Sequence, residues 1–308
     1  MSSLAPPAPV GIVPTRVILP FIIVTLIWGS TWTAIRYQIE AGIDPFWSIG
    51  LRFSIAAAAI FAYGAALRQP LRLPIGGYAY AIAFGSSQFF LNFVFVYEAE
   101  RYVTSGVVAM FFALLIIPNA ILGRIFLKAS VGREFIIGSL IAGAGLAMLF
   151  AHEIGAVARD GSDKAALGIG YTMIALIFAS FANVSQGAVR VRALPPLGVL
   201  AWGMTAGATF AILVALVRSG LPTGLTPLYL GSTLYLGLAG SALTFPLYFF
   251  MLRQIGPARA AYTGVAVPVI AMILSTILEG YRWSMPAVIG SLLALGGLVI
   301  AMRARKPA

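Results

Sequence analysis

Apolar and polar residues are arranged along this chain in long blocks. Ten mostly apolar stretches follow one another, separated by short segments that carry most of the charge. A helix of about twenty residues crosses a hydrocarbon layer roughly 30 Å thick, and lipid offers the backbone no hydrogen-bond partners. We therefore predict an all-α integral membrane protein with ten transmembrane helices, at residues 17–36, 46–67, 77–97, 104–127, 135–151, 167–189, 197–217, 228–252, 258–278 and 286–302.

The last five stretches repeat features of the first five at a nearly constant offset. Pro118 in the fourth stretch and Pro268 in the ninth are 150 residues apart, and residues 138–142 resemble residues 290–294. Helices rich in Leu, Ala and Gly can resemble one another by chance, but matches at nearly one offset favour an internal repeat. Because five is an odd number, the two units must face opposite ways, which predicts two inverted five-helix repeats.

The expected domain boundaries follow from these stretches. The apolar run after the proline-rich start is too long for a signal peptide and has no small-residue cleavage site, so it is predicted to be the first span. The longest connection contains glycine and charge and is expected to join the halves. The predicted units are a disordered cytoplasmic tail (1–16), a first five-helix repeat (17–151), an extracytoplasmic loop (152–166), a second five-helix repeat (167–302) and a basic cytoplasmic tail (303–308).

Composition supports a membrane protein and narrows the possible chemistry. The chain is 60% hydrophobic and 9% charged, whereas a soluble domain carries about 25% charged residues. It has no cysteine and one histidine, His152, so disulfides and thiolate metal sites are excluded and we expect no metal or cofactor. A membrane enzyme would need a positioned base, nucleophile or metal, so we expect no catalytic activity.

The net charge of +11 is concentrated in short loops, a pattern that fits a membrane protein better than a nucleic-acid surface. Threading the ten spans places thirteen Lys and Arg residues on one side and six on the other. Because basic loops stay in the cytoplasm, this bias predicts a multi-pass protein of the cell inner membrane with both termini in the cytoplasm.

A set of short motifs accompanies this pattern in order: Trp28-Gly29-Ser30-Thr31-Trp32, Asp44-Pro45, Leu51-Arg52-Phe53, Pro118, Pro268 and Leu278-Glu279-Gly280. With these motifs nearly the whole chain resembles the ten-helix EamA-type permeases of the drug/metabolite transporter superfamily. The resemblance implies two inverted repeats and movement of small metabolites, often export of amino acids or related compounds. The chain departs from the family at Lys128-Ala129, where a Gly-Glu-like turn often follows the fourth span, so a role for Glu279 need not be symmetric.

One face of the first span carries candidate substrate-binding residues. Trp28, Trp32 and Arg36 follow Thr25 at spacings of three, four and four, which places all four on one side of a helix. Two indoles beside a guanidinium suit an amphipathic metabolite with a carboxylate, through stacking and a charge-assisted hydrogen bond. Alternatively, the indoles pack against other helices and Arg36 extends to the membrane surface as an anchor.

Other spans carry polar stripes within apolar runs. Gln88 and Asn92 lie four residues apart, and their amides can donate to and accept from a zwitterion or a nucleobase-like solute. Alternatively, they bond a neighbouring helix, which contributes about 0.6 kcal/mol in a membrane. The remaining candidates from similar stripes are Ser180, Asn183, Gln186, Ser241, Thr244, Tyr248, Tyr262 and Thr263.

Arg52 lies six residues into the second span, too deep for a loop charge. A structural ion pair with Asp44 or Glu40 near the outer mouth is the favoured interpretation. The alternative is that Arg52 attracts anionic groups that enter the protein there.

Pro118 and Pro268 each remove a backbone hydrogen bond within a span and bend the helix, so both are candidate hinges. Gly138 with Ala142, and the residue pair 290 and 294, are small residues that permit close helix approach. We interpret the fifth and tenth spans as scaffold, with a possible homodimer through either.

The acidic residues bear on mechanism. Glu98, Glu153 and Glu279 lie at the edges of spans, so no central carboxylate is recognised as a proton or sodium carrier. We therefore predict gradient-driven movement or exchange of a small-molecule substrate by alternating access around a central cavity, and not obligate proton coupling through a central carboxylate. The alternatives left open are a nucleotide-sugar-like or drug transporter of the same fold, and a channel or scramblase.

Overall fold

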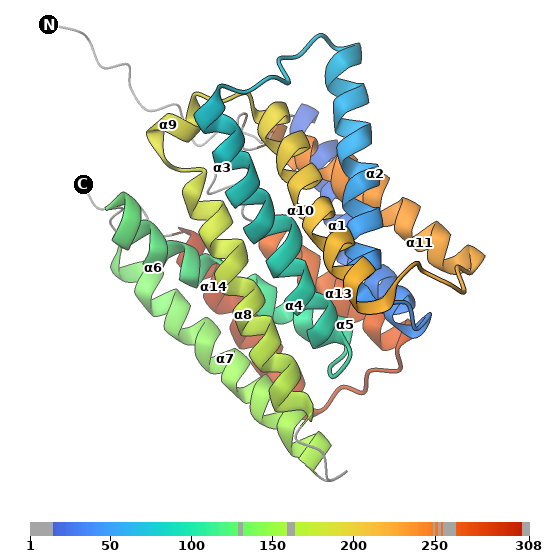
Figure 1. Cartoon of the computed structure of the whole chain (residues 1–308). Helices are drawn as coiled ribbons and strands as arrows, with labels where there is room; N and C mark the ends of the chain where they lie inside the picture. Colours follow the sequence, from blue (N-terminus) through green and yellow to red (C-terminus); the bar gives the residue numbers. More distant parts are fainter. Residues whose placement is uncertain are drawn as a thin grey trace, which may run out of the picture.

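The computed structural model describes residues 15–128, 132–158, 164–248, 250–251, 254 and 263–303, and its regular structure there is entirely helical (Figure 1). The first half contains α1 Thr15–Glu40, α2 Pro45–Ala66, α3 Ile75–Gly85, the π-helix η1 Ser86–Leu91, α4 Asn92–Glu100, α5 Ser105–Ala113, α6 Ile116–Leu127 and α7 Arg133–Ala158. The second half contains α8 Lys164–Ser185, α9 Val189–Arg192, α10 Pro196–Ser219, α11 Pro227–Gly237, the π-helix η2 Leu238–Leu243, α13 Thr263–Leu278 and α14 Met285–Arg303.

Long helices lie side by side and form a bundle (Figure 1). Within the described ranges, seven helical segments are long and apolar enough to cross a membrane, and α13 and α14 contain shorter apolar helices. Many large apolar side chains on the outside of the bundle are exposed, such as Leu19, Ile125 and Leu140. An apolar exterior of this kind is what a lipid solvent requires.

Two predicted boundaries differ from the structure. The predicted tail ends at residue 16, but α1 already begins at Thr15. The predicted loop 152–166 is helical at both ends, since α7 continues to Ala158 and α8 begins at Lys164. Residues 152–158 contain no proline and are mostly apolar, so nothing stops the helix at residue 151. Residues 1–14, 159–163 and 304–308 lie outside the described part.

The fourth predicted span is interrupted near Pro118. Helix α5 ends at Ala113, and α6 begins at Ile116. Pro118 has no N–H to donate to the carbonyl of Leu114, and a 2.8 Å bond from the N–H of Ile117 to that carbonyl closes a tighter turn instead. By contrast, α13 runs through the buried Pro268 without a break from Thr263 to Leu278.

The third and eighth predicted spans each contain a π-helix. Both η1 and η2 directly follow a buried glycine, Gly85 or Gly237. A Cβ at Gly85 would lie 2.0 Å from the carbonyl oxygen of Gly203, and one at Gly237 would lie 2.8 Å from Cγ2 of Ile55. Only glycine fits at these helix crossings. Because a π-helix changes the hydrogen-bond register and often occurs at functional sites, the two segments draw attention to their side chains.

Packing between the two halves is reciprocal. Helix α2 contacts α10, α5 contacts α13 and α7 contacts α14. Three further sets of contacts match in the same way: α3 with α10 and α11 with α2, α1 with α13 and α6 with α8, and α4 with α8 and α11 with α1. In each of these sets, corresponding helices of the two halves have exchanged places.

Helices α7 and α14 use their small residues against each other. A Cβ added at Gly138 would lie 2.6 Å from the carbonyl oxygen of Gly297, and one at Gly145 would lie 2.5 Å from that of Gly290. Likewise, a Cβ at Gly297 would meet the backbone N of Ala142 at 2.3 Å. The small-residue faces that suggested a homodimer are thus occupied within one chain, and they give no support to the predicted dimer.

Candidate functional site

Trp28 brings the first span to the segment that follows η2. Its indole Nε1 donates to Oγ1 of Thr244 at 2.8 Å. Its ring lies 5.2 Å from that of Tyr248 and 5.6 Å from that of Phe245, centroid to centroid. Three predicted substrate residues, Trp28, Thr244 and Tyr248, therefore come together although they come from opposite halves of the sequence.

Trp32 and Arg36 have separate surroundings on the same helix. The half-buried Trp32 packs against Phe112, with ring centroids 5.1 Å apart. Arg36 donates through Nε to Oε1 of Glu40 at 2.9 Å and through Nη1 to the backbone carbonyl of Glu100 at 2.7 Å. These bonds join α1 to the end of α4 and favour the structural alternative for Arg36.

Arg52 is buried inside the bundle. Its Nε donates to Oγ of Ser241 in η2 at 3.2 Å. The guanidinium carbon lies 4.4 Å from the ring centre of Phe93 and 5.1 Å from that of Phe53, which is cation–π geometry. Its Nη1 is buried and makes no hydrogen bond to the described residues, while the hydroxyl of Tyr97 lies near the guanidinium. The guanidinium of Arg52 therefore packs on aromatic rings and keeps one N–H group without a hydrogen bond.

The predicted ion pair of Arg52 with Asp44 or Glu40 is wrong, because both acids have other partners. Asp44 caps α2 by accepting from the N–H of Phe46 at 2.9 Å, and its other oxygen lies 3.7 Å from Nε of Arg218. Glu40 pairs with Arg36 at 2.9 Å. Asp44 and Glu40 both make their contacts at helix ends. Arg52 lies two turns further along α2, and its side chain extends into the bundle.

The amides of Gln88 and Asn92 leave two acceptors unused. Nδ2 of Asn92 donates to the backbone carbonyl of Gln88 at 3.3 Å. Oε1 of Gln88 and Oδ1 of Asn92 are buried, and the described structure provides no donor for either. Gln88 lies in η1 one residue before Phe89, and Asn92 begins α4 one residue before Phe93, whose ring contacts the Arg52 guanidinium. Unpaired acceptors thus lie on the same stretch of helix that supports the guanidinium.

Aromatic rings connect these polar groups. Phe89 contacts Phe53 with ring centroids 5.0 Å apart and Phe245 at 5.6 Å, and Phe245 in turn contacts Trp28. We define the central site as six polar or indole residues on or next to the helical segments that carry these rings: Trp28, Arg52, Gln88, Asn92, Ser241 and Thr244. Both π-helices contribute to it, through Gln88 and Ser241.

A second polar network was not recognised from sequence. The hydroxyl of Tyr97 donates to Oε1 of Gln38 at 2.5 Å, and Nε2 of Gln38 donates to Oγ1 of Thr233 at 2.6 Å. The side chain of Thr233 donates to the carbonyl of Tyr229, whose hydroxyl lies 3.0 Å from Oγ of Ser48. Gln38 lies between Arg36 and Glu40 at the end of a span, so nothing in the sequence indicates that its amide is buried.

Two acidic residues near this network differ in their surroundings. Glu279 accepts from the N–H of Ser105 at 3.0 Å, from the hydroxyl of Ser105, and from the hydroxyl of Ser275 at 3.3 Å. Glu100 is 0% exposed, and neither of its carboxylate oxygens has a partner in the described part of the chain. The sequence does not indicate that Glu100 is buried, because it is the last residue before a turn, where acids are normally solvated.

The other candidates are placed as follows. Ser180 is buried on α8, and Thr263 is buried at the start of α13. Asn183 is exposed, and Gln186 is half-buried in the turn after α8. No described hydrogen bond joins Asn183 or Gln186 to the central site. Tyr262 lies outside the described residues.

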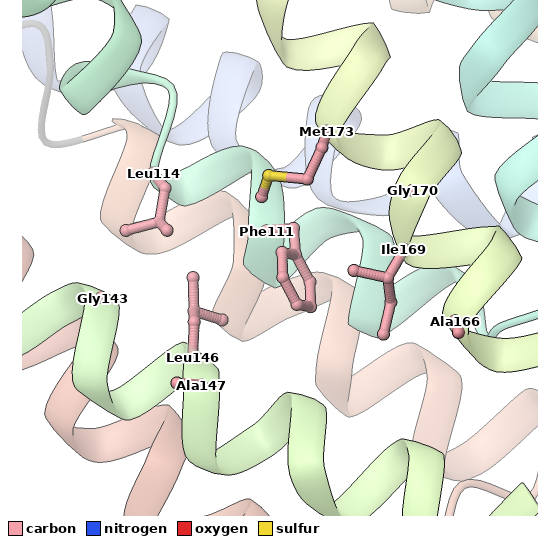
Figure 2. A pocket seen from close by; sticks show the side chains of 9 residues that line it. All are labelled: Phe111, Leu114, Gly143, Leu146, Ala147, Ala166, Ile169, Gly170 and Met173. Carbon is pink, nitrogen blue, oxygen red and sulfur yellow. The ribbon is translucent and has the colours of Figure 1, made fainter.

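A cavity in the described structure lies away from these residues. It has a volume of about 420 Å³ between α5, α7 and α8, and its lining is Phe111, Leu114, Gly143, Leu146, Ala147, Ala166, Ile169, Gly170 and Met173. The side chains that line it carry only carbon and sulfur (Figure 2). Such a lining offers nothing to hold a charged or zwitterionic solute, and it contains none of the predicted substrate residues.

Comparison with known proteins shows what this chain resembles. The model of the EamA-like transporter family matches residues 15–151 and residues 166–303. The "Probable terminal-alkyne amino-acid exporter" of Streptantibioticus cattleyicolor is 25% identical over 306 residues, 94% of each chain. The uncharacterized inner membrane transporter YedA of Escherichia coli is 27% identical over 281 residues, 90% of this chain and 86% of that one.

Two further matches agree with these. Protein PagO of Salmonella typhimurium is 26% identical over 282 residues, 89% of this chain and 91% of that one. One solved crystal structure has the same fold, with a TM-score of 0.66 and 19% identity over 93% of this chain and 96% of that chain.

Proposed function

The chain belongs to the EamA-like transporter family, and from this premise we propose that it exports small amphipathic metabolites, with amino acids and related compounds as the favoured class. Membership makes the protein a membrane transporter of small molecules, and the inner-membrane relative agrees with a multi-pass protein of that membrane. A family of transporters gives no reason to expect an enzyme. The relative named as an amino-acid exporter supports the substrate class.

One observation carries the choice of solute. Arg52 presents a buried guanidinium N–H without an acceptor, while Gln88 and Asn92 present buried amide oxygens without donors. Buried polar groups without partners are costly, so a ligand that pairs with them gains that energy on binding. A carboxylate matches Arg52, and an ammonium group matches the two amide oxygens. An amino acid carries both groups on its Cα and so offers a partner for each kind of unpaired atom in the central site.

The apolar part of the solute has a matching surface. Trp28, Phe89, Phe93 and Phe245 surround the polar groups, and an indole or phenyl ring offers both apolar contact and stacking. This favours amino acids with apolar or aromatic side chains. A cationic drug is disfavoured because its charge would meet Arg52.

We further propose that the solute moves by alternating access between two inverted five-helix repeats. The family model matches once in each half. The reciprocal helix contacts and the antiparallel small-residue packing of α7 on α14 are what a pseudo-two-fold axis in the membrane plane would produce. In this mechanism the interruption beside Pro118 serves as a hinge, with Pro268 as its counterpart. The predicted topology, with both termini in the cytoplasm, completes the proposal.

Counterflow in proteoliposomes tests the proposed function. Vesicles loaded with L-phenylalanine should accumulate radiolabelled L-phenylalanine through the purified protein, with saturation that a channel would not show. Arg52→Met should lower the apparent affinity about tenfold or more, because a hydrogen bond to a charged group is worth roughly 1.5–3 kcal/mol. Arg218→Met is the matched control, since Arg218 is exposed and contacts Asp44. Competition by organic anions but by no amino acid would overturn the amino-acid assignment.

A further inference from the structure

Glu100 is a buried acid that the proposed function leaves without a role. It is the last residue of α4, is 0% exposed, and has two carboxylate oxygens without hydrogen-bond partners in the described structure. Glu98, two residues earlier on the same helix, has the surroundings that are usual for an acid. Its side chain is 23% exposed and accepts from Arg101 at 3.2 Å. The position of Glu100 is therefore unusual even for its own helix.

The charged groups around Glu100 come from three other elements. They are Arg36 on α1, Arg52 on α2 and Glu279 at the end of α13, with the hydroxyl of Tyr97 on its own helix. Arg36 is bonded to Glu40 and to the backbone carbonyl of Glu100, and not to its carboxylate. Glu279 accepts from Ser105 and Ser275. Among the described residues no ion pair within 4.0 Å joins Glu100 to either arginine.

We propose that Glu100 is a proton-binding site of the transport cycle, and that the proton and the substrate carboxylate bind to the protein together. The proposal rests on the proposed function for its substrate half. An ionised carboxylate with no donor in a buried position is costly, whereas the neutral acid can remain there. Binding converts the Glu100 carboxylate and one proton into the carboxylic acid, and no further reactant is needed.

Charge links this event to the central site. When Glu100 is ionised, its negative charge offsets the positive field of Arg52, and a substrate carboxylate is held less strongly. When Glu100 is protonated, the field of Arg52 is available to the substrate. Because coupling between two binding sites is reciprocal, the substrate also raises the affinity for the proton. Export down a substrate gradient would then carry a proton outward with the solute.

Infrared difference spectroscopy tests the proton site without any substrate. The purified protein in lipid is titrated between mildly alkaline and mildly acidic pH, and the carbonyl band of a protonated carboxylic acid is followed. A band that appears on acidification should vanish in Glu100→Gln and persist in Glu98→Gln. Glu100→Asp should keep a titrating band at a shifted position and guards against a folding defect. A Glu100 carbonyl band that does not change with pH, or no such band, would overturn the proposal.

Proteoliposomes test the coupling, with L-phenylalanine as the probe. In the wild type, the apparent affinity for the probe should rise about tenfold from alkaline to acidic pH, within the usual range of coupling between sites. In Glu100→Gln the affinity should no longer depend on pH, and in Glu98→Gln the dependence should remain. Unchanged pH dependence in Glu100→Gln would contradict the coupling. If L-phenylalanine is not carried at all but the infrared band titrates, the substrate assignment fails while the proton site stands.

Discussion

The bond between the indole of Trp28 and the hydroxyl of Thr244 is the direct side-chain link between the first span and the segment after η2 within the central site. The distance from Nε1 to Oγ1 is 2.8 Å, and Thr244 also donates to the carbonyl of Gly240 at 2.9 Å. Thr244 is 0% exposed in this structure, so the indole and not water is the donor to its hydroxyl. The two side chains should therefore be energetically coupled.

A double-mutant cycle measures that coupling. Trp28→Phe keeps a ring but removes the donor, and Thr244→Val keeps the shape but removes the acceptor. We expect a coupling free energy of about 0.6 kcal/mol, the average for side-chain hydrogen bonds between membrane helices. Reversible unfolding of the purified protein in mixed micelles gives the four free energies of unfolding. Strictly additive effects of the two substitutions would contradict a bond between them.

At the residue scale, the sequence identifies side chains that the structure brings together, and their role in substrate binding stays a prediction. Trp28, Thr244 and Tyr248 were chosen from separate stripes, and the structure brings them together. Arg52 and Glu100 show the limit of this reasoning. Periodicity gives the face on which Arg52 lies but not its neighbour, Ser241, which is 189 positions away. The burial of Glu100 depends on helices distant in sequence, so position at the end of a span says nothing about its solvation.

At the scale of elements, the glycine before each π-helix sets how closely the helices cross. Gly85→Ala should lower the free energy of unfolding by about 1–3 kcal/mol, because the added Cβ would lie 2.0 Å from the backbone oxygen of Gly203. Gly76→Ala in the same helix is the matched control, since nothing lies within 4 Å of its Cβ position. This control should be neutral or stabilising by up to about 1 kcal/mol, because alanine favours a helix over glycine.

Unfolding in mixed micelles separates these two variants. Equal free energies of unfolding for Gly85→Ala and Gly76→Ala would show that α3 and α10 do not cross as closely as described.

Nothing in the Ser-Ser-Gln-Phe-Phe-Leu run of η1 distinguishes it from an ordinary α-helix, so the sequence did not predict either π-helix. The register change arises from the crossing and not from local propensity. The positions of the apolar stretches, which local composition does determine, were predictable.

At the scale of the whole molecule, opposite orientation of the two halves makes a prediction about equivalent residues. Gln69 follows α2, the second helix of the first half, and Leu221 follows α10, the second long helix of the second half. Both side chains are exposed, and Leu221 is 75% exposed. If the halves are inverted, these corresponding positions lie on opposite sides of the membrane. Parallel repeats would place both on the same side.

Single-cysteine labelling decides between these arrangements, and the natural chain contains no cysteine that must first be removed. In intact cells opened only at the outer membrane, a membrane-impermeant maleimide should label Leu221→Cys. It should label Gln69→Cys only after the inner membrane is permeabilised, because the basic loops are expected to be cytoplasmic. Arg101→Cys, in the turn after α4, should behave like Leu221→Cys. Labelling of Gln69→Cys and Leu221→Cys from the same side would remove the two-fold relation, and with it the argument for alternating access around a shared site.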